Sequence, residues 1–387
     1  MRAIVCGAGI AGLTTATCLA RTGWEVIVLE RAPALRDQGY MIDFAGPGFD
    51  TAERMGLLPA LDRVRYRMEL IRWLDEDGGT ALTTRYEIFE RMLAGRFRSL
   101  LRGDIERALH DALPASVEMR FGRTVESLRD EGGHVTVDTG GGILEKADLL
   151  VGADGVRSRV RSLAFGPESE FVRDLGYRTS AFIFEDAGLH DALHNEFRLL
   201  AMPDRQAGFY PLRDARVATF FAHRGSEALP ADPVQALREH YQGMGWFLPQ
   251  AIDAAARLPS VYYDIVAQVV MPRWSRGRVV LVGDAAQAVS LLAAQGASIA
   301  MAAGEALAQS LAHASGVEAG LERYEAGLRK QVAKSQAAGR RMAKWVVPAS
   351  RARIKARNLF MRVVEFRAFD AFARHVLLGK EKARPPA

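Results

Sequence analysis

Apolar residues occur along this 387-residue chain in two arrangements, short unbroken runs and runs that alternate with polar residues. Unbroken runs of three or four residues occupy positions 3–6, 26–29, 149–151 and 279–282. Such runs are typical of parallel strands that are buried on both faces. An apolar helical stretch separates the first two runs, so the chain is predicted to open with a strand, a helix and a second strand in one layer.

The alternating arrangement predicts a different kind of sheet. Residues 68–74 and 81–84 flank the turn Asp77-Gly78-Gly79 and predict a hairpin. Alternating, aromatic-rich strands are expected at 177–184, 197–202, 208–212, 217–221 and 261–270. We expect them to form an antiparallel sheet over a Rossmann-like layer, with a cleft between the two domains that suits a small molecule.

The two patterns interleave, so the predicted domains are discontinuous. The chain returns to the first layer through a helix at Arg102, a strand at 117–121, a turn at 131–133 and, much later, a helix over 297–314. The fold class is therefore α/β, with a Rossmann-like nucleotide-binding domain, an antiparallel-sheet substrate domain and a C-terminal helical region. The expected boundaries are 1–66, 100–174 and 271–330 for the first, 67–99 and 175–270 for the second, and 331–387 for the basic helical region.

A glycine-rich turn joins the first strand to its helix. The sequence is Gly7-Ala8-Gly9-Ile10-Ala11-Gly12, and Glu30 ends the second strand 18 residues after Gly12. In a dinucleotide-binding turn the first glycine makes the tight turn, the second lets the backbone approach a pyrophosphate, and the third permits close helix–strand packing. The acid after the second strand accepts hydrogen bonds from a ribose. A glycine-rich turn with an exposed glutamate is the alternative.

Two further glycine–acid pairs follow buried runs downstream. Asp154-Gly155 follows the run at 149–151, and Gly283-Asp284 follows the run at 279–282. A second contact so far along the chain suits a long flavin dinucleotide lying across the sheet better than a nicotinamide cofactor. Simple turn chemistry is the alternative at Asp154.

These three motifs, in this order, resemble the FAD-dependent aromatic hydroxylase family, single-component flavoprotein monooxygenases of the para-hydroxybenzoate hydroxylase type. The resemblance spans roughly residues 1–330. Arg102 matches the arginine that opens the helix after the first substrate-domain hairpin in such enzymes. Gly39-Tyr40-Met41-Ile42-Asp43 and the loop 295–298 look nearest to the tetracycline-degrading and polyketide-tailoring branch.

The resemblance implies an oxidoreductase that binds FAD, uses NAD(P)H and O2, and hydroxylates an aromatic or polycyclic phenolic small molecule through a flavin C4a-hydroperoxide. The implied setting is secondary metabolism, such as antibiotic biosynthesis, or antibiotic inactivation. The predicted cofactor-binding residues are Gly7, Gly9, Ile10, Ala11, Gly12, Glu30, Arg31, Arg102, Asp154, Asp284, Gly296, Ala297 and Ser298. A helix that starts near Ser298 would direct its amides at the anionic edge of a reduced flavin, with Ser298 also suited to cap that helix.

The loop 287–298 departs from the usual family pattern. Gln287, Leu291, Ala294 and Ser298 stand where His, Pro, Gly and Asn are usual. The departures leave two alternative functions open, a non-redox cyclase or isomerase built around FAD, and a non-catalytic flavin-binding protein.

No side chain stands out as a general base or a metal ligand, so the catalytic residues are left unknown and no metal site is expected. The polar candidates are Arg198, Tyr210, His223 and Gln268. Aromatic candidates to line the cleft, each also suited to core packing, are Tyr177, Phe182, Phe184, Phe197, Phe209, Tyr210, Phe221 and Tyr262.

Composition narrows the setting. With 49% apolar and 25% charged residues the chain can bury a large core, and no apolar run reaches the ~18 residues of a membrane span. The N-terminus enters the first strand directly and Cys6 and Cys18 suit buried thiols, so a cytoplasmic enzyme is expected.

The stretch 329–362 is basic and contains no acid. It is interpreted as a solvated helix face that docks through Trp345, Val346, Phe360 and Val363, with an anionic partner as the alternative. Membrane-surface contact and nucleic-acid binding are not expected, and the oligomeric state is left open.

Overall fold

The computed structural model describes residues 1–35 and 40–364, which form two compact units. Unit 1 contains Met1–Arg65, Arg98–Tyr177 and Ile265–Ala343; unit 2 contains Tyr66–Phe97, Arg178–Asp264 and the described residues from Lys344 onward. The α/β fold class is confirmed. The expected helical region 331–387 is divided between the two units over its described part, and the domain boundaries expected from the sequence stay a prediction. Gly39 and residues 365–387 lie outside the described residues.

Unit 1 begins with the predicted strand, helix and strand: β1 (Arg2–Cys6), α1 (Ile10–Arg21) and β2 (Glu25–Glu30). Its further elements up to β11 are β3 (Met41–Ala45), α2 (Pro47–Met55), α3 (Leu58–Val64), β6 (Phe97–Leu101), α5 (Arg102–Asp111), β7 (Val117–Phe121), β8 (Ser127–Asp130), β9 (Val135–Asp138), β10 (Leu144–Ala147) and β11 (Leu149–Gly152). The remaining elements are α6 (Arg159–Ala164), α7 (Glu168–Phe171), β18 (Ser275–Arg276), β19 (Val279–Leu281), α11 (Asp284–Gln287), the 3-10 turn η1 (Leu291–Ala293), α12 (Gly296–Ala312) and α13 (Val317–Val346).

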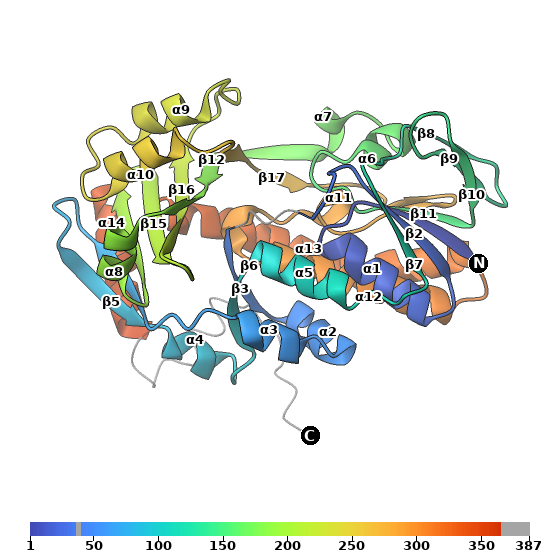
Figure 1. Cartoon of the computed structure of the whole chain (residues 1–387), viewed down its shortest axis with the longest axis horizontal. Helices are drawn as coiled ribbons and strands as arrows, with labels where there is room; N and C mark the ends of the chain where they lie inside the picture. The colour runs from blue at the N-terminus through green and yellow to red at the C-terminus, as the bar shows by residue number, and fades with distance from the viewer. Residues whose placement is uncertain (36–39, 365–387) are drawn as a thin grey trace. The chain divides into compact units, whose positions relative to one another are not determined.

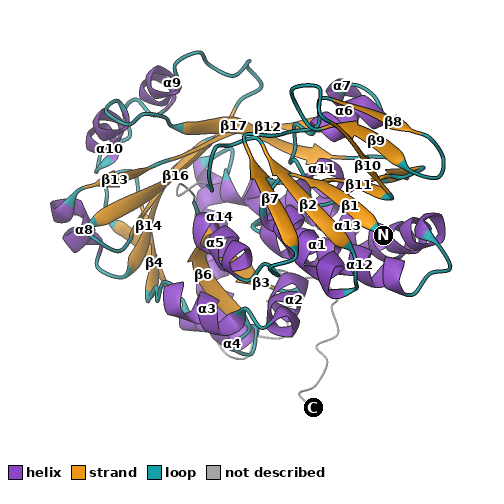
Figure 2. Ribbon diagram, turned by 45° about the vertical axis from the view of Figure 1, so that its right-hand side comes forward, coloured by secondary structure: helices purple, strands orange, loops and turns teal. Residues whose placement is uncertain are grey.

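The main sheet of unit 1 has six strands in the order β18-β19-β11-β1-β2-β7. Figure 2 shows β11, β1, β2 and β7 of this sheet. All neighbours are parallel except β18 and β19. The residues Ala3, Ile4 and Val5 of the central strand β1 are fully buried. Unbroken apolar runs predicted this sheet because parallel strands need apolar residues on both faces.

Helices α1 and α12 lie side by side in unit 1 (Figure 1). Their contact is close because Gly304 of α12 faces Thr15 of α1, where a Cβ on Gly304 would come within 2.8 Å of the Thr15 hydroxyl oxygen. This packing aligns the two helix N-termini near the ends of β1 and β19. The free thiols Cys6 and Cys18 lie in this unit, and burial raises the pKa of each to about 12.

Unit 2 holds the predicted hairpin, β4 (Leu70–Leu74) and β5 (Thr80–Arg85). Its other elements are α4 (Glu87–Met92), β13 (Ile183–Glu185), α8 (Ala187–Leu193), β14 (Glu196–Met202), β15 (Arg205–Pro211), β16 (Arg216–Arg224), α9 (Pro233–His240), α10 (Leu248–Ala255) and α14 (Arg351–Val364). The strands β12 (Val172–Ala181) and β17 (Tyr262–Val269) each belong partly to both units.

The larger sheet is ordered β17-β12-β16-β15-β14-β4-β5, with β13 also paired to β16. The pairs β4–β5, β14–β15, β15–β16 and β13–β16 are antiparallel, as predicted, but β4 and β14 run parallel. Alternation along each strand cannot reveal this pairing, because the two strands are more than a hundred residues apart in the chain.

The basic stretch 329–362 forms two helices, α13 and α14, rather than one, because Pro348 lies between them. Several of its cations bind the protein itself: Arg340 donates to Gln268, Arg351 pairs with Glu76, and the buried Arg357 donates to Gln206. Trp345 and Phe360 pack edge to face, with ring centroids 5.1 Å apart. Much of this charge is therefore used in holding the helices in place. Among the described residues, no helix is long and apolar enough to cross a membrane.

Candidate functional site

Two of the four polar candidates lie on adjacent strands of unit 2. Arg198 donates to Glu196 at 2.8 Å and to the carbonyl of Ala192 at 2.6 Å. Tyr210 is buried, and its ring meets that of Phe197 edge to face at 5.2 Å. Arg72 also pairs with Glu196, so Arg198 belongs to a three-residue ion pair that joins β4 to β14.

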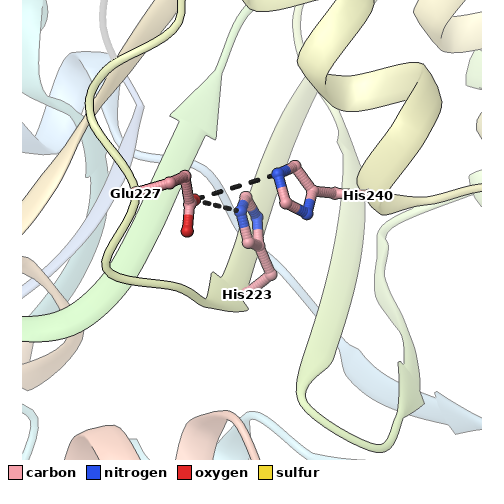
Figure 3. Close-up of side chains that lie close together, drawn as sticks. All are labelled: His223, Glu227 and His240. Atoms are coloured by element: carbon pink, nitrogen blue, oxygen red, sulfur yellow. Dashed lines mark ion pairs between the residues drawn. The ribbon is translucent and has the colours of Figure 1, made fainter.

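The third polar candidate, His223, lies at the end of β16 beside Glu227 and His240 (Figure 3). The His223 and His240 rings are stacked with centroids 4.0 Å apart. Burial and the neighbouring His240 lower the pKa of His223 to about 4, so this imidazole is neutral at neutral pH. The cluster is a separate feature of unit 2, and sequence reasoning did not identify Glu227 or His240.

The fourth polar candidate, Gln268, belongs to unit 1 and is fully used in a buried network. Its amide nitrogen donates to the carbonyls of Val289 and Gln336, and its amide oxygen accepts from Arg340. A buried amide with these partners ties α13 to the segment that follows α11. These contacts give Gln268 a structural role.

Most of the aromatic candidates are core residues. Phe182, Phe184, Phe209 and Phe221 belong to one hydrophobic cluster of unit 2, and Phe182 stacks on Phe221 with centroids 5.6 Å apart. Tyr262 is exposed. The alternation that predicted their strands is thus explained by core packing.

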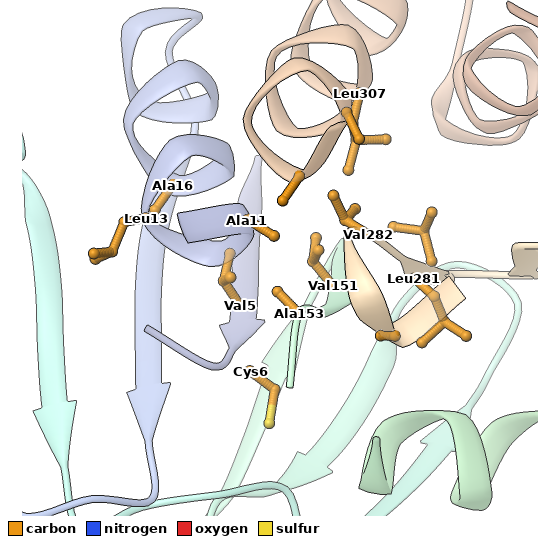
Figure 4. Packing of buried hydrophobic residues seen from close by; sticks show 14 of the residues in the cluster. Val5, Cys6, Ala11, Leu13, Ala16, Val151, Ala153, Leu281, Val282 and Leu307 are labelled. Carbon is orange, nitrogen blue, oxygen red and sulfur yellow. The ribbon is translucent and has the colours of Figure 1, made fainter. Parts of the chain in front are cut away.

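The glycine-rich turn of unit 1 packs against β11 and β19, in the apolar layer drawn in Figure 4. Gly7 has a φ of +108°, and a Cβ there would lie 2.5 Å from the carbonyl oxygen of Ala153. A Cβ on Gly12 would lie 1.8 Å from the Gly7 carbonyl oxygen. The fold itself therefore requires glycine at both positions.

Gly9 differs from its two neighbouring glycines. It caps α1 with a φ of −77°, which any residue adopts. A Cβ there would meet only Glu106 Oε1 at 3.4 Å and Arg102 Nη2 at 3.5 Å, which are ordinary contacts. Nothing in the described chain demands glycine at this position, which is consistent with a demand that comes from a bound ligand instead.

Glu30 is held at the end of β2 by the turn. One carboxylate oxygen accepts from the amide of Ala8 at 2.9 Å and the other from the amide of Ala32 at 2.8 Å. An ionised carboxylate has about four acceptor sites, so both oxygens can still accept from ribose hydroxyls. The adjacent Arg31 is exposed.

Arg102 and Asp284 bring two distant segments to the same place. Arg102 opens α5, donates its amide to the carbonyl of Tyr40, and pairs with Glu106 at 2.8 Å. Asp284 opens α11 after Gly283, where a Cβ would lie 2.6 Å from the Cβ of Ala11 in α1.

The Asp284 carboxylate is reachable and yet crowded. The residue has an exposed surface, but protein atoms packed around the carboxylate partly desolvate it and raise its pKa, while the Arg102 charge lowers it. The protein atoms around the carboxylate lower the local dielectric constant. A ligand that reaches this carboxylate therefore forms a stronger hydrogen bond than it would at an open surface.

The helix α12 begins at Gly296, two residues before the predicted start near Ser298. Ser298 is therefore inside the first turn and does not cap the helix. Its hydroxyl instead accepts from the amide of Gly48 at 2.8 Å, which ties α12 to α2. Gly296 lies beside Asp284, since a Cβ on Gly296 would be 3.9 Å from Asp284 Oδ1. Ala297 is half-buried at the same helix N-terminus.

Asp154 is engaged within its own turn. Its carboxylate accepts from the Ser158 hydroxyl at 2.5 Å and from the amides of Arg159 and Val160. These bonds satisfy donors at the N-terminus of α6, as turn chemistry requires.

The unusual loop 287–298 is bonded at its start to the segments around it. Gln287 donates to the Tyr324 hydroxyl at 2.6 Å and accepts from the amide of Gly283. Ala294, which stands where Gly is usual, has a φ of +53° in the left-handed region. At position 294 the loop thus keeps a backbone conformation that favours glycine, although the residue there is alanine.

Sequence reasoning missed two acidic groups near these segments. Glu106 could have been found from its spacing of four residues from Arg102 on one helix. Asp43 of β3 accepts from the Ser99 hydroxyl of β6 at 2.7 Å, and burial raises its pKa to about 6. Only the pairing of β3 with β6 reveals that contact.

Comparisons with known proteins agree with the geometry of unit 1. The family model described as FAD binding domain matches residues 1–338. An uncharacterized protein of Mycobacterium tuberculosis is 34% identical over 325 residues, covering 80% of this chain and 84% of that protein. A flavin-dependent monooxygenase of an unknown prokaryotic organism is 29% identical over 347 residues, covering 87% and 88%. The crystal structure of tetracycline destructase Tet(51) is 26% identical with a TM-score of 0.79, covering 94% of this chain and 96% of that one.

Proposed function

Because the chain belongs to the FAD binding domain family and is an FAD-dependent monooxygenase, we propose that it uses NAD(P)H and O2 to hydroxylate an aromatic or polycyclic phenolic small molecule. FAD supplies the electron transfer and oxygen activation. The residues of the chain bind and orient it and set the charge around it. The similarity to a tetracycline destructase supports a polycyclic phenol and a role in secondary metabolism or antibiotic inactivation.

The observation that carries the cofactor assignment is a glycine at position 9, at the N-terminus of α1, that the fold itself does not require. The first helical hydrogen bond of α1 runs from the Leu13 amide to the Gly9 carbonyl, so the amides of residues 10–12 precede the ladder. Amides at a helix N-terminus bind phosphate groups. We assign the pyrophosphate to these amides and the adenosine ribose to Glu30.

Asp284 and Arg102 are assigned to the ribityl and phosphate part of FAD. Their opposite charges suit neighbouring hydroxyl and phosphate groups. The N-terminus of α12, at Gly296 and Ala297, is assigned to the flavin edge that becomes negative on reduction, because the helix dipole favours a negative charge there. Asp154 is assigned an indirect role, because its hydrogen bonds hold the turn that follows β11.

The proposal is tested by the absorption spectrum of the purified protein, followed by NADH and NADPH oxidation with a panel of phenols that includes tetracycline. We expect bound FAD, substrate-stimulated oxidation and a product heavier by one oxygen atom. A product that forms anaerobically without a reductant would instead show a cyclase or isomerase. A flavin that neither nucleotide reduces with any phenol would overturn the proposal.

A further inference from the structure

Three side chains of unit 2 converge from separate segments at the end of β16. His223 is the second-last residue of that strand, Glu227 lies in the loop after it, and His240 ends α9. Figure 3 shows the three side chains pointing toward one another. Glu227 Oε1 is 3.5 Å from His223 Nε2 and 3.8 Å from His240 Nε2, and one ligand atom from each residue lies within 4.8 Å of the others.

The surrounding residues hold these groups in position. The Tyr241 hydroxyl is 3.3 Å from His223 Nδ1, on the side of the ring opposite Glu227. A hydrogen bond at one ring nitrogen orients the other toward a metal ion. Arg178 donates to the backbone carbonyl of Glu227 at 3.0 Å, which anchors the loop that carries the carboxylate.

We propose that His223, Glu227 and His240 bind one divalent transition-metal ion, with Zn²⁺ as the expected occupant. Two imidazole nitrogens and one carboxylate oxygen form a common zinc ligand set. Zinc bonds of ~2.0–2.2 Å in a tetrahedron place ligand atoms ~3.3–3.6 Å apart. The observed separations of 3.5 and 3.8 Å are close to this range.

The Tyr263 hydroxyl lies 3.2 Å from His223 Nε2, on the side of the ring that faces Glu227. A water held by this hydroxyl would complete four-coordinate zinc, as water does at zinc sites with three protein ligands.

Two features of the cluster oppose metal binding, a neighbouring positive charge and the stacking of the two imidazole rings. Arg178 lies 3.8 Å from Glu227 Oε1, so its charge repels a cation and limits the affinity. The stacked rings are inclined by 22°, whereas an ion lies in the plane of each imidazole it binds, so the rings must splay apart. His240 is the half-buried partner at a helix end and makes this movement.

The bound ion would join α9 to β16 across the loop between them. Its effect would be to stabilise unit 2 by an amount that grows with the logarithm of the zinc concentration once zinc exceeds its dissociation constant, since a ligand that binds only the folded state raises the unfolding free energy. This role is independent of the flavin chemistry, because none of the three ligands is assigned to FAD.

The test uses the full-length, FAD-loaded protein without a histidine tag, stripped with a chelator and titrated with Zn²⁺ against a chromophoric zinc indicator. We expect one zinc ion per chain, and we expect His240→Ala to weaken zinc binding by about a hundredfold or more. Glu227→Gln should weaken it as well. His134→Ala serves as the matched control, because His134 contacts a single acid, Glu131.

Flavin content is measured in parallel to show that each variant is folded. Binding of one zinc ion that His240→Ala weakens and His134→Ala does not would support the site. Absence of stoichiometric zinc in the unaltered protein would overturn the proposal, as would equal affinity in the unaltered protein and folded His240→Ala.

Discussion

The substitution Gly9→Ala tests whether glycine at this position is needed for FAD binding or for folding. In the ligand-free chain the new Cβ meets Glu106 and Arg102 at 3.4 and 3.5 Å, so it displaces nothing. The backbone φ of −77° also suits alanine. We expect the unfolding free energy of the FAD-free protein to change by less than about 1 kcal/mol, the scale of a helix-cap substitution.

FAD binding should respond quite differently. The methyl group would hold a pyrophosphate away from the amides that follow Gly9. Loss of two charge-assisted hydrogen bonds at ~1.5–3 kcal/mol each amounts to ~3–6 kcal/mol, or about a hundred- to ten-thousandfold in the dissociation constant. Quenching of flavin fluorescence on titration of the FAD-free protein measures this constant.

The control for Gly9→Ala is Gly327→Ala in α13, where an added Cβ meets nothing within 4 Å. It should bind FAD normally and gain about 1 kcal/mol of stability from helix propensity. A folded Gly9→Ala protein that retains FAD with an unchanged dissociation constant would refute the placement of the pyrophosphate.

Asp284→Ala should leave the fold intact and raise the FAD dissociation constant ten- to a hundredfold, the loss of ~1.5–3 kcal/mol from one hydrogen bond to a charged group; an unchanged constant removes Asp284 from the site. Ala297→Glu places a negative charge at the N-terminus of α12 and should lower the two-electron flavin potential by about 30 mV, which corresponds to ~1.4 kcal/mol; an unchanged or raised potential in a potentiometric titration means that this helix does not face the flavin. Burial raises the pKa of Asp43 to about 6 in the folded protein, above the unfolded value of 3.8, so its contribution to stability is full below about pH 4 and is lost as the pH rises through 6. Asp43→Asn keeps an acceptor for Ser99, and urea unfolding should show the variant gaining up to ~3 kcal/mol over the unaltered protein between pH 4 and pH 7; a difference that is constant with pH contradicts this.

The sequence was sufficient for the elements that local pattern determines. Unbroken apolar runs predicted the parallel strands β1, β2, β11 and β19, and alternation with a glycine turn predicted the hairpin of β4 and β5. The three glycine–acid motifs together identified the FAD-binding family, because their order and spacing reflect the contacts that a long dinucleotide needs along the sheet.

Contacts between distant segments could not be predicted in this way. Gln268 looked like a substrate contact because its partners Gln336 and Arg340 come from a helix about 70 residues further along the chain. Ser298 was expected to cap a helix because serine is a common N-cap residue. Its true partner, Gly48, lies 250 residues earlier and could not be found from the local sequence. The assembly of His223 with Glu227 and His240 depends on how a loop and α9 return to β16, which no local pattern encodes.

Reaction under ¹⁸O₂ tests the central claim most directly. With a phenolic substrate and NAD(P)H, the account predicts one ¹⁸O atom in each product molecule, with one NAD(P)H oxidised per product, and no label when ¹⁸O is supplied as water instead. A product that carries oxygen from water, or that forms without O2, would contradict the assignment as a monooxygenase of aromatic substrates.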